Sequence, residues 1–423
     1  MTPLSVALIG CGNRAQNNYM TSLIGLKEFL NVTAVCDPNP EHGQAGADML
    51  GATYYDSLTR LAKDKPMEAA VVVTPLLSHH AVSCYLSSHG IHNLVETSIA
   101  PTLTQAREMV DTAGRHGVYF RIAEQFFRDH FDIISRTVIE ANVIGDVHRM
   151  TNFHAHTGYH NNSRHQVFAG CPPLAVNSIE HYMPTMTYVN TGRPTTGEMY
   201  HQRSFHFANG MLINDLAGNA KGALGRYARP GLIEIDGTQG TIVQEAVGDW
   251  TGSAEVRLVP EENVNYNGYT KGYPIVYEYR NQDGSIEDIQ AHPKSMWYKM
   301  YPKDKAFVAV RVDLPDQTIR IENEFLKCGV EVAYHAEIAE HLKEFAQLVR
   351  TGSPDRFTPD MALMSLIMDM ASTLSVERQG ARVEMNDPDI GKTDEEKLAA
   401  IEKELGVDPM DVQAMVDYSF PRV

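Results

Sequence analysis

The chain has 423 residues, of which 43% are hydrophobic and 21% are charged, so it is long enough for two domains of ordinary size with full cores. Its formal net charge of −17 argues against nucleic acid or an anionic membrane as a partner, because both would be repelled. No stretch approaches the roughly 18 uninterrupted apolar residues of a membrane span, and residues 4–9 lack the flanks of a signal peptide. The five cysteines are widely spaced and suggest no disulfide framework. We therefore expect a cytoplasmic protein with no membrane and no nucleic-acid partner.

The first 125 residues alternate short apolar runs with longer, helix-like stretches. The runs are Leu4–Ile9, Val32–Cys36, Ala69–Thr74, His92–Val95 and Val118–Ile122. Buried parallel strands have this pattern, because helices cover both faces of their sheet. Repeated strand–helix units predict right-handed crossovers and a doubly wound sheet, which is the Rossmann arrangement.

From about residue 145 the pattern changes. Val147–His156 alternates between apolar and polar residues, as a half-buried strand does. Further strand-like runs lie at 204–216, 221–228, 231–243, 254–259 and 306–313. These runs predict a larger, open and mostly antiparallel sheet.

The remaining segments are a polar stretch and three helices. Residues 260–305 are rich in Tyr, Asn, Asp and Lys and are expected to form an elaborated loop region. Periodicity predicts helices at 335–351 and 359–378, and a charged amphipathic surface helix at 393–405. The expected fold class is α/β, divided into a Rossmann domain, an α/β domain that holds the substrate and subunit contacts, and a helical tail, at residues 1–125, 126–385 and 386–423.

A glycine-rich motif of the GxGxxA type follows the first apolar run. It reads Gly10-Cys11-Gly12-Asn13-Arg14-Ala15. Gly10 permits a tight turn, Gly12 lets the backbone approach a diphosphate, and Ala15 lets the helix pack closely on the strand. The phosphates would then lie at the helix N-terminus, near Asn13 and Arg14.

Asp37 ends the second apolar run and extends this interpretation. A carboxylate at that place accepts hydrogen bonds from the adenosine ribose and repels a 2′-phosphate. The residues after Asp37 are Pro38 and Asn39, with no arginine, which favours NAD over NADP. The alternative is a glycine turn in a Rossmann-like domain that holds no cofactor.

Several motifs in the same order along the chain carry a family resemblance. Besides the glycine motif and Asp37 they are Thr74-Pro75-Leu76-Leu77-Ser78-His79, Glu96-Thr97-Ser98-Ile99-Ala100 and Gly237-Thr238-Gln239-Gly240. Over roughly residues 4–385 the chain resembles the Gfo/Idh/MocA family.

The resemblance implies a Rossmann domain followed by an α/β domain, with the active site between them and the nicotinamide facing the second domain. Thr74, Pro75, His79, Glu96 and Thr97 would lie on the cofactor side, with His79 near the nicotinamide ribose. Family members mostly oxidise or reduce a hydroxyl carbon of sugars, inositols and related polyols, and they are commonly dimers or tetramers. A carbohydrate substrate and a homodimer or homotetramer are therefore expected.

Two departures from the family pattern concern catalysis. The usual Glu-Lys-Pro motif reads Glu96-Thr97-Ser98, so the usual lysine is missing. The usual Asp-xxx-His motif is matched to Asn177 and His181, so the histidine is kept and the aspartate is an amide. Because hydride transfer from a hydroxyl carbon needs a base for the hydroxyl proton, His181 is the matched candidate. On a helix Asn177 shares a face with His181, and it would orient the base or bind a substrate hydroxyl.

Loss of the lysine is also similar to a branch of the family, the NAD-dependent glycosidases. These enzymes hold NAD tightly, oxidise the sugar, eliminate the aglycone, add water and reduce the ring again. Their glutamate after the fifth strand is matched here by Glu124. The tyrosine of their Tyr-Pro-Thr-His signature is absent, and Tyr159 or Tyr182 is a conceivable substitute.

Residues 148–181 hold six histidines in a polar, aromatic stretch where the family's substrate pocket lies. Hydroxyl-rich ligands need convergent donors and acceptors, and histidine also moves protons near neutral pH. His156, His160 and Arg164 are therefore substrate-binding candidates, although any one histidine could instead be structural. Zinc binding by a His-x-His pair is an alternative, but no further cysteine or carboxylate has ligand spacing, so no metal is expected.

Three functions remain open from the sequence. The first is an NAD-dependent oxidoreductase acting on a ring hydroxyl of a sugar, glycoside or related polyol. The second is a redox-neutral glycosidase or lyase that recycles its NAD. The third is a non-catalytic, nucleotide-binding protein that kept the Rossmann core.

Overall fold

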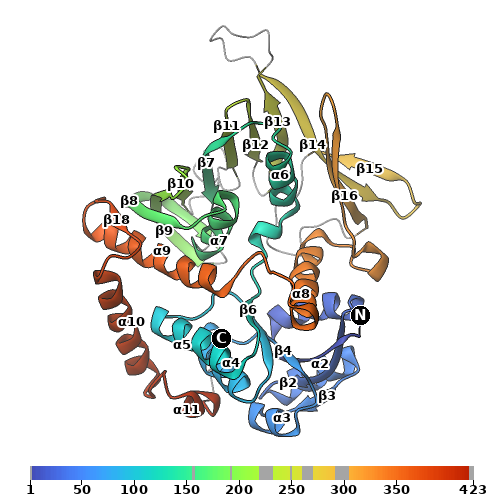
Figure 1. Ribbon diagram of the computed structural model, residues 1–423, viewed down its shortest axis with the longest axis vertical. Coiled ribbons are helices and arrows are strands. Elements are labelled where there is room, and N and C mark those ends of the chain that lie inside the picture. The colour runs from blue at the N-terminus through green and yellow to red at the C-terminus, as the bar shows by residue number, and fades with distance from the viewer. Residues whose placement is uncertain are drawn as a thin grey trace.

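Two β-sheets organise the chain, one in each half (Figure 1). The computed structural model describes residues 2–154, 158–190, 193–218, 232–247, 250–259, 270–290 and 304–418. Among these residues, no helix has both the length and the apolar character needed to cross a membrane.

The N-terminal sheet has six parallel strands in the order β3-β2-β1-β4-β5-β6. Its strands are β1 (Leu4–Ile9), β2 (Leu30–Cys36), β3 (Thr53–Tyr55), β4 (Ala69–Val72), β5 (His92–Val95) and β6 (Phe120–Ile122). Side chains of β1 alternate between two separate hydrophobic clusters, with Leu4, Val6 and Leu8 in one cluster and Ala7 and Ile9 in the other. The sheet is therefore buried on both faces, which is why its strands are continuous apolar runs.

Helices connect these strands. They are α1 (Met20–Gly25), preceded by a π-helical turn at Ala15–Tyr19, then α2 (Pro40–Leu50), α3 (Leu58–Asp64), η2 (Leu76–Ser78), α4 (His79–Ser88) and α5 (Leu103–His116). The predicted Rossmann arrangement is confirmed. The three-residue edge strand β3 was not predicted, because it is too short to form an apolar run.

The second sheet has twelve strands in the order β17-β16-β14-β13-β12-β11-β7-β10-β9-β8-β18, with β15 added beside β14. Its strands are β7 (Val147–His154), β8 (Pro173–Asn190), β9 (Arg193–Phe207), β10 (Leu212–Ala217), β11 (Leu232–Gly237), β12 (Gly240–Val247), β13 (Trp250–Leu258), β14 (Lys271–Arg280), β15 (Ile286–Ile289), β16 (Ala306–Asp313), β17 (Thr318–Glu322) and β18 (Val383–Glu384). Among the described strand pairs of this sheet, β7 with β10 is parallel and the others are antiparallel. The predicted α/β class with a mostly antiparallel second sheet is confirmed.

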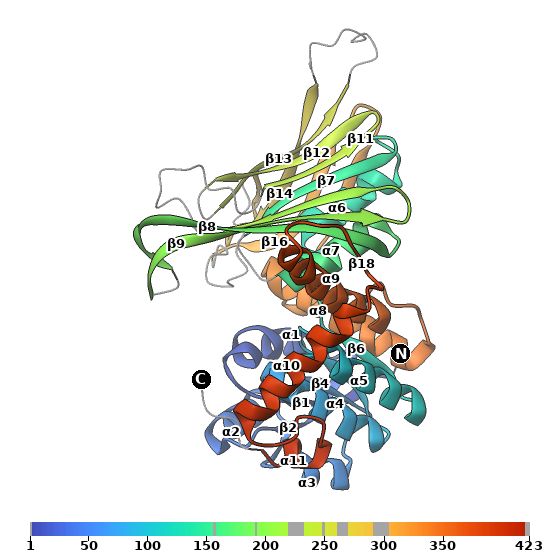
Figure 2. The ribbon, with the colours of Figure 1, turned by 90° about the vertical axis from the view of Figure 1, so that its left-hand side faces the viewer.

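Helices α7, α8 and α9 lie between the two sheets (Figure 2). The helices and helical turns of this half are η3 (Phe126–Arg128), α6 (His130–Glu140), α7 (Gly158–Ala169), η5 (Leu326–Cys328), α8 (Ala333–Thr351) and α9 (Pro359–Glu377). This arrangement brings side chains of α7 and α8 to the edge of the first sheet.

The tail forms α10 (Asp389–Leu405) and α11 (Val412–Val416), which run back along the first sheet's helices (Figure 2). The carboxylate of Asp394 accepts hydrogen bonds from the backbone N–H groups of Leu103 (2.5 Å) and Thr104 (2.8 Å) at the start of α5. The helix predicted at 393–405 is therefore present, and it is attached to the first sheet's layer by a buried residue.

Three sequence predictions need comment. Residues 177–181 were expected to be helical, but they lie in β8, paired with β9. The stretch 260–305 was expected to be a loop region, but it contains β14 and β15. The strand predicted at 221–228 lies outside the described residues. The division of the chain at residues 125 and 385 remains a prediction.

Candidate functional site

The turn after β1 leaves room where a diphosphate would lie. Gly10 has φ +88°, and a Cβ atom there would lie 2.4 Å from the carbonyl oxygen of Val73, so only glycine fits. At Gly12 a Cβ would meet no heavy atom within 4 Å, so space is open over its backbone. Helical structure begins at Asn13, which directs N–H groups toward this space. The residues present therefore fit the diphosphate of a dinucleotide.

Asp37 follows β2 beside this turn. Its Oδ2 accepts a hydrogen bond from the N–H of Cys11 at 2.7 Å, and its Oδ1 accepts one from the N–H of Asn39 at 2.8 Å. Each oxygen keeps a further lone pair for a ribose hydroxyl. Burial and the Asp37 charge raise the pKa of Cys11 to about 12, so this thiol stays protonated and is no nucleophile.

A cavity of about 310 Å³ opens where the carboxyl ends of β4, β5 and β6 meet α7 and α8. In open α/β sheets, ligands bind at this end of the strands. The cavity is lined by Arg14, Val73, Thr74, Glu96, Thr97, Gln125, Phe126, Tyr159, His160 and Tyr334. Residues from both halves of the chain therefore contribute to one site.

Arg14 links the two halves on one wall of the cavity. Its Nε donates to Glu96, and its Nη1 donates to the hydroxyl of Tyr334 on α8. Glu96 also accepts hydrogen bonds from the backbone N–H (2.6 Å) and the hydroxyl (3.1 Å) of Thr97. Burial by itself would raise the pKa of Glu96, but Arg14 and the Thr97 N–H hold it below its ordinary value. Glu96 is therefore an ionised partner of Arg14, and Thr97 donates its proton to that carboxylate.

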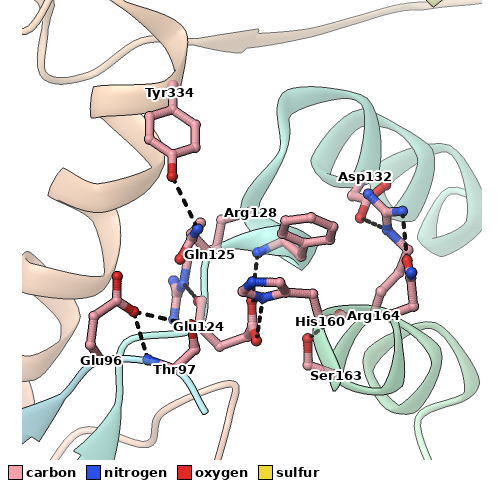
Figure 3. Close-up of polar contacts among 12 residues, drawn as sticks. Glu96, Thr97, Glu124, Gln125, Arg128, Asp132, His160, Ser163, Arg164 and Tyr334 are labelled. Carbon is pink, nitrogen blue, oxygen red and sulfur yellow. Dashed lines mark hydrogen bonds and ion pairs between the residues drawn. The ribbon is translucent and has the colours of Figure 1, made fainter. Parts of the chain in front are cut away.

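A histidine and a carboxylate form a pair on the opposite wall (Figure 3). Nδ1 of His160 lies 2.9 Å and 3.0 Å from the two carboxylate oxygens of Glu124. Both side chains are almost fully buried, with 6% and 2% exposed. In the neutral tautomer with Nδ1–H donating to Glu124, Nε2 of His160 is the nitrogen that accepts a proton.

His79 is a buried residue between the loops that follow β4 and β5. Its Nδ1 lies 2.8 Å from the carbonyl oxygen of Ser98, and its Nε2 lies 2.9 Å from that of Thr74. Pro75 lies just before the helical turn η2, and His79 lies just after it. Burial lowers the pKa of His79, although both carbonyl contacts oppose this effect. The side chain therefore ties together the two loops that follow β4 and β5.

His181 and Asn177 lie away from the cavity. His181 is exposed on β8, and neither it nor Asn177 lines the cavity. In a strand, residues four apart share a face but lie about 13 Å apart, so they cannot act on one substrate atom. The amide of Asn177 instead bonds the carbonyl oxygen of Gly380 at 3.1 Å and the ring of His206 at 3.1 Å. These positions give no support to the predicted roles of His181 in catalysis and of Asn177 in substrate binding.

The other predicted substrate residues divide into three cases. His160 and Tyr159 line the cavity, as expected. Arg164 does not: it is 3% exposed and its Nε donates to Asp132 at 2.5 Å. His156 lies outside the described residues.

Four residues that line the cavity were missed, namely Val73, Gln125, Phe126 and Tyr334. Gln125 and Phe126 directly follow Glu124 at the carboxyl end of β6, and that position was a usable signal. Tyr334 lies at the start of α8, far away in sequence, and no local pattern singles it out. For the part of the chain with assigned positions, no group of three or more His, Cys, Asp or Glu residues could hold a metal ion.

Comparison with known families agrees with this geometry. Residues 4–124 match the GFO_IDH_MocA family model, described as an oxidoreductase family with an NAD-binding Rossmann fold. The predicted resemblance to this family is confirmed for residues 4–124, and the NAD-binding fold of the family model agrees with the predicted cofactor.

The chain is also similar to curated proteins and to solved structures. It is 29% identical over 155 residues to D-glucoside 3-dehydrogenase of Escherichia coli, covering 36% of this chain and 43% of that protein. It is 24% identical over 155 residues to glycosyl hydrolase family 109 protein 2 of Akkermansia muciniphila, covering 34% of this chain and 32% of that protein. The matches thus span less than half the length of these relatives.

Among solved structures, the fold resembles an oxidoreductase from Agrobacterium radiobacter in complex with NAD+, L-tartaric acid and magnesium. The TM-score is 0.62 at 17% identity, covering 91% of this chain and 99% of that one. This likeness extends over both sheets.

Proposed function

Because residues 4–124 belong to the Gfo/Idh/MocA oxidoreductase family, we propose that the protein is an NAD-dependent oxidoreductase acting on a hydroxyl of a sugar, glycoside or related polyol. The observation that carries the proposal is that His160, paired with the buried Glu124, lines the same cavity as Thr74, Glu96 and Thr97. The glucoside dehydrogenase relative supports a carbohydrate substrate.

The cofactor would be held along the carboxyl edge of the first sheet. Gly10, Gly12, Asn13, Arg14 and Ala15 would hold the diphosphate region, and Asp37 the adenosine ribose. Thr74, Pro75, His79, Glu96 and Thr97 would form the nicotinamide side. When bound there, NAD supplies the acceptor for a hydride.

The protein's own contribution to the reaction is proton transfer and orientation. Nε2 of His160 takes the proton of the substrate hydroxyl, while Glu124 holds Nδ1–H and stabilises the imidazolium that forms. The Thr97 hydroxyl is engaged with Glu96, so it does not replace the missing lysine as a base. A general base of this kind contributes about 10²–10⁴ in rate.

Redox-neutral cleavage of a glycoside or elimination is the second candidate function. The contact between Glu124 and His160 favours this second function. Elimination from an oxidised ring requires proton transfer at more than one atom, and the two side chains are two groups that exchange protons. Tyr159, with its ring 4.2 Å from that of His160, is a further candidate for this proton transfer. The similarity to a family 109 glycosyl hydrolase supports the same reading. A non-catalytic nucleotide-binding role is the remaining alternative.

One experiment separates the three. Purified protein is mixed with NAD and a panel of sugars, polyols and aryl glycosides, and both NADH absorbance and aglycone release are followed. NADH accumulation supports the oxidoreductase, and aglycone release without net NADH supports the redox-neutral enzyme. If neither NADH nor free aglycone appears, the result supports the non-catalytic role.

A pair of variants tests the assigned base. His160→Gln should lower kcat about 10²–10⁴-fold with NAD affinity unchanged, whereas His181→Gln, at an exposed strand position, should retain full activity. The reverse result would restore the assignment made from sequence spacing.

We also propose a homodimer or homotetramer in the cytoplasm. Large apolar side chains exposed on β8 and β9 support self-association; they are Leu174, Ile179, Tyr182, Met186 and Met199. The free cysteines, which are buried or half-buried, fit a reducing compartment.

A further inference from the structure

Phe126 covers both the proposed base and a neighbouring arginine. It opens the helical turn η3 and lines the cavity. Its ring stacks on the imidazole of His160, with centroids 4.2 Å apart and 8° between the planes. The guanidinium carbon of Arg164 lies 5.5 Å from the centroid of the same ring. Because His160 and Arg164 are four residues apart on α7, they share one helix face, and one aromatic side chain contacts both.

The backbone N–H of Phe126 also contacts Glu124, the partner of the proposed base. Its N–H donates to Oε1 of Glu124 at 3.0 Å. The same oxygen lies 2.9 Å from Nδ1 of His160. One residue thus fixes the plane of the imidazole through its ring and the position of the carboxylate through its amide.

Arg164 has a buried counter-ion. Its Nε lies 2.5 Å from Oδ2 of Asp132, and the two side chains are 3% and 0% exposed. This ion pair holds the guanidinium at the ring of Phe126.

Other side chains lie around the same imidazole. Glu124 contacts its Nδ1, and the ring of Tyr159 lies 4.2 Å away. Arg14 and Glu96 line the same cavity.

We propose that Phe126, Arg164 and Asp132 are positioning residues for His160. Phe126 fixes the orientation of the imidazole, and the ion pair of Arg164 with Asp132 supports the ring of Phe126. The inference rests on the proposed function, because it assigns a purpose to the orientation of His160.

The ring contact is tested with two substitutions of Phe126. Phe126→Leu removes the stacked face and should lower kcat about tenfold or more, with KM and NAD affinity changed less than about threefold. Phe126→Tyr keeps the face and should keep kcat within about threefold. Circular dichroism and NAD titration confirm that each variant is folded. Equal kcat values for Leu and Tyr would overturn the proposed orientation by stacking.

The stacking is also tested without substrate. Nuclear magnetic resonance of the full chain with labelled histidines follows the His160 ring signals at a single pH, assigned by their loss in His160→Gln. Phe126→Leu should move these signals, because the stacked aromatic ring and its ring current are lost. Phe126→Tyr keeps the aromatic ring and should leave the signals close to their wild-type positions.

This measurement separates the two proposals. Unchanged His160 signals in Phe126→Leu would overturn the positioning role. If the signals move but no sugar or glycoside gives turnover, the proposed function fails and the stacking contact stands.

Discussion

Of two glycines in one turn, one should lose stability on substitution by alanine and the other should not. Gly10→Ala forces an alanine into φ +88° and brings its Cβ to 2.4 Å from a backbone oxygen. We expect it to lower the free energy of unfolding by about 2–4 kcal/mol, from the left-handed conformation and the overlap together. Gly12→Ala meets no heavy atom within 4 Å, and its φ lies outside the left-handed region, so the free protein should keep its stability within about 1 kcal/mol.

The effect of Gly12→Ala should appear when NAD is added. A methyl group at this place occupies the space proposed for the diphosphate, and we expect the Kd for NAD to rise about a hundredfold, or about 2.7 kcal/mol. At a concentration one hundred times the wild-type Kd, NAD stabilises the wild type by about 2.7 kcal/mol and the variant by about 0.4 kcal/mol. In a chain of 423 residues, 1 kcal/mol corresponds to roughly 1 °C in Tm.

Thermal unfolding with and without NAD, together with calorimetric titration, measures these quantities. The expected pattern is a Tm increase of roughly 3 °C for the wild type and less than about 1 °C for Gly12→Ala. An undiminished increase in Gly12→Ala would refute the location of the diphosphate. If Gly12→Ala without NAD had a Tm as low as that of Gly10→Ala, the geometry of the turn would be refuted.

Three further predictions concern the tail, acid stability and assembly. Asp394→Asn weakens the cap of α5 and should lower the free energy of unfolding in urea by about 1–2 kcal/mol, whereas Glu395→Gln on the exposed face should change it little. Burial lowers the pKa of His130 from 6.5 to about 4. Its neutral ring therefore contributes full stability above pH 6.5, and this stability is lost as the pH falls toward 4. His130→Gln should flatten the dependence of the free energy of unfolding on pH across that range. A variant with Ile179→Glu and Met186→Glu on the exposed face of β8 should have the mass of a monomer in light scattering, and an unchanged larger mass would contradict this surface.

The strands of the first sheet could be predicted from the sequence because a sheet buried on both faces has strands that are continuous apolar runs. The predicted run His92–Val95 coincides with β5, and Leu4–Ile9 coincides with β1. The edge strand β3 at Thr53–Tyr55 has one face against solvent and only three residues, so it gave no such signal. In the second sheet, 306–313 coincides with β16 for the same reason of burial.

Helix α7 could not be predicted from the sequence because its buried face is polar. Helix α7 buries His160, Asn161 and Arg164, which in a soluble helix usually mark the solvent side. Their partners lie on distant elements: Asn152 on β7 donates to Asn161 at 2.9 Å, and Asp132 on α6 pairs with Arg164. Local periodicity contains no information on such partners.

The spacing used to match the family's Asp-xxx-His motif is ambiguous in this chain. An Asn-xxx-His spacing occurs three times, at Asn152 with His156, at Asn161 with His165 and at Asn177 with His181. Spacing alone does not say which occurrence is helical, and the structure places Asn161 and His165 on a helix and Asn177 and His181 on a strand. The glycine turn, Asp37 and Glu124 were easier to single out in the sequence, because each lies within two residues of the end of a buried strand.

The attachment of the tail to α5 bears on how the protein is made. During synthesis the first sheet leaves the ribosome early, yet the carboxylate that caps Leu103 comes from Asp394, 291 residues later. Val412 and Val416, near the end of the described chain, pack against the hydrophobic cluster of the first sheet's layer. The domain that is translated first is therefore completed last, and a nascent chain of about 385 residues would hold an unfinished nucleotide-binding domain that chaperones have time to engage.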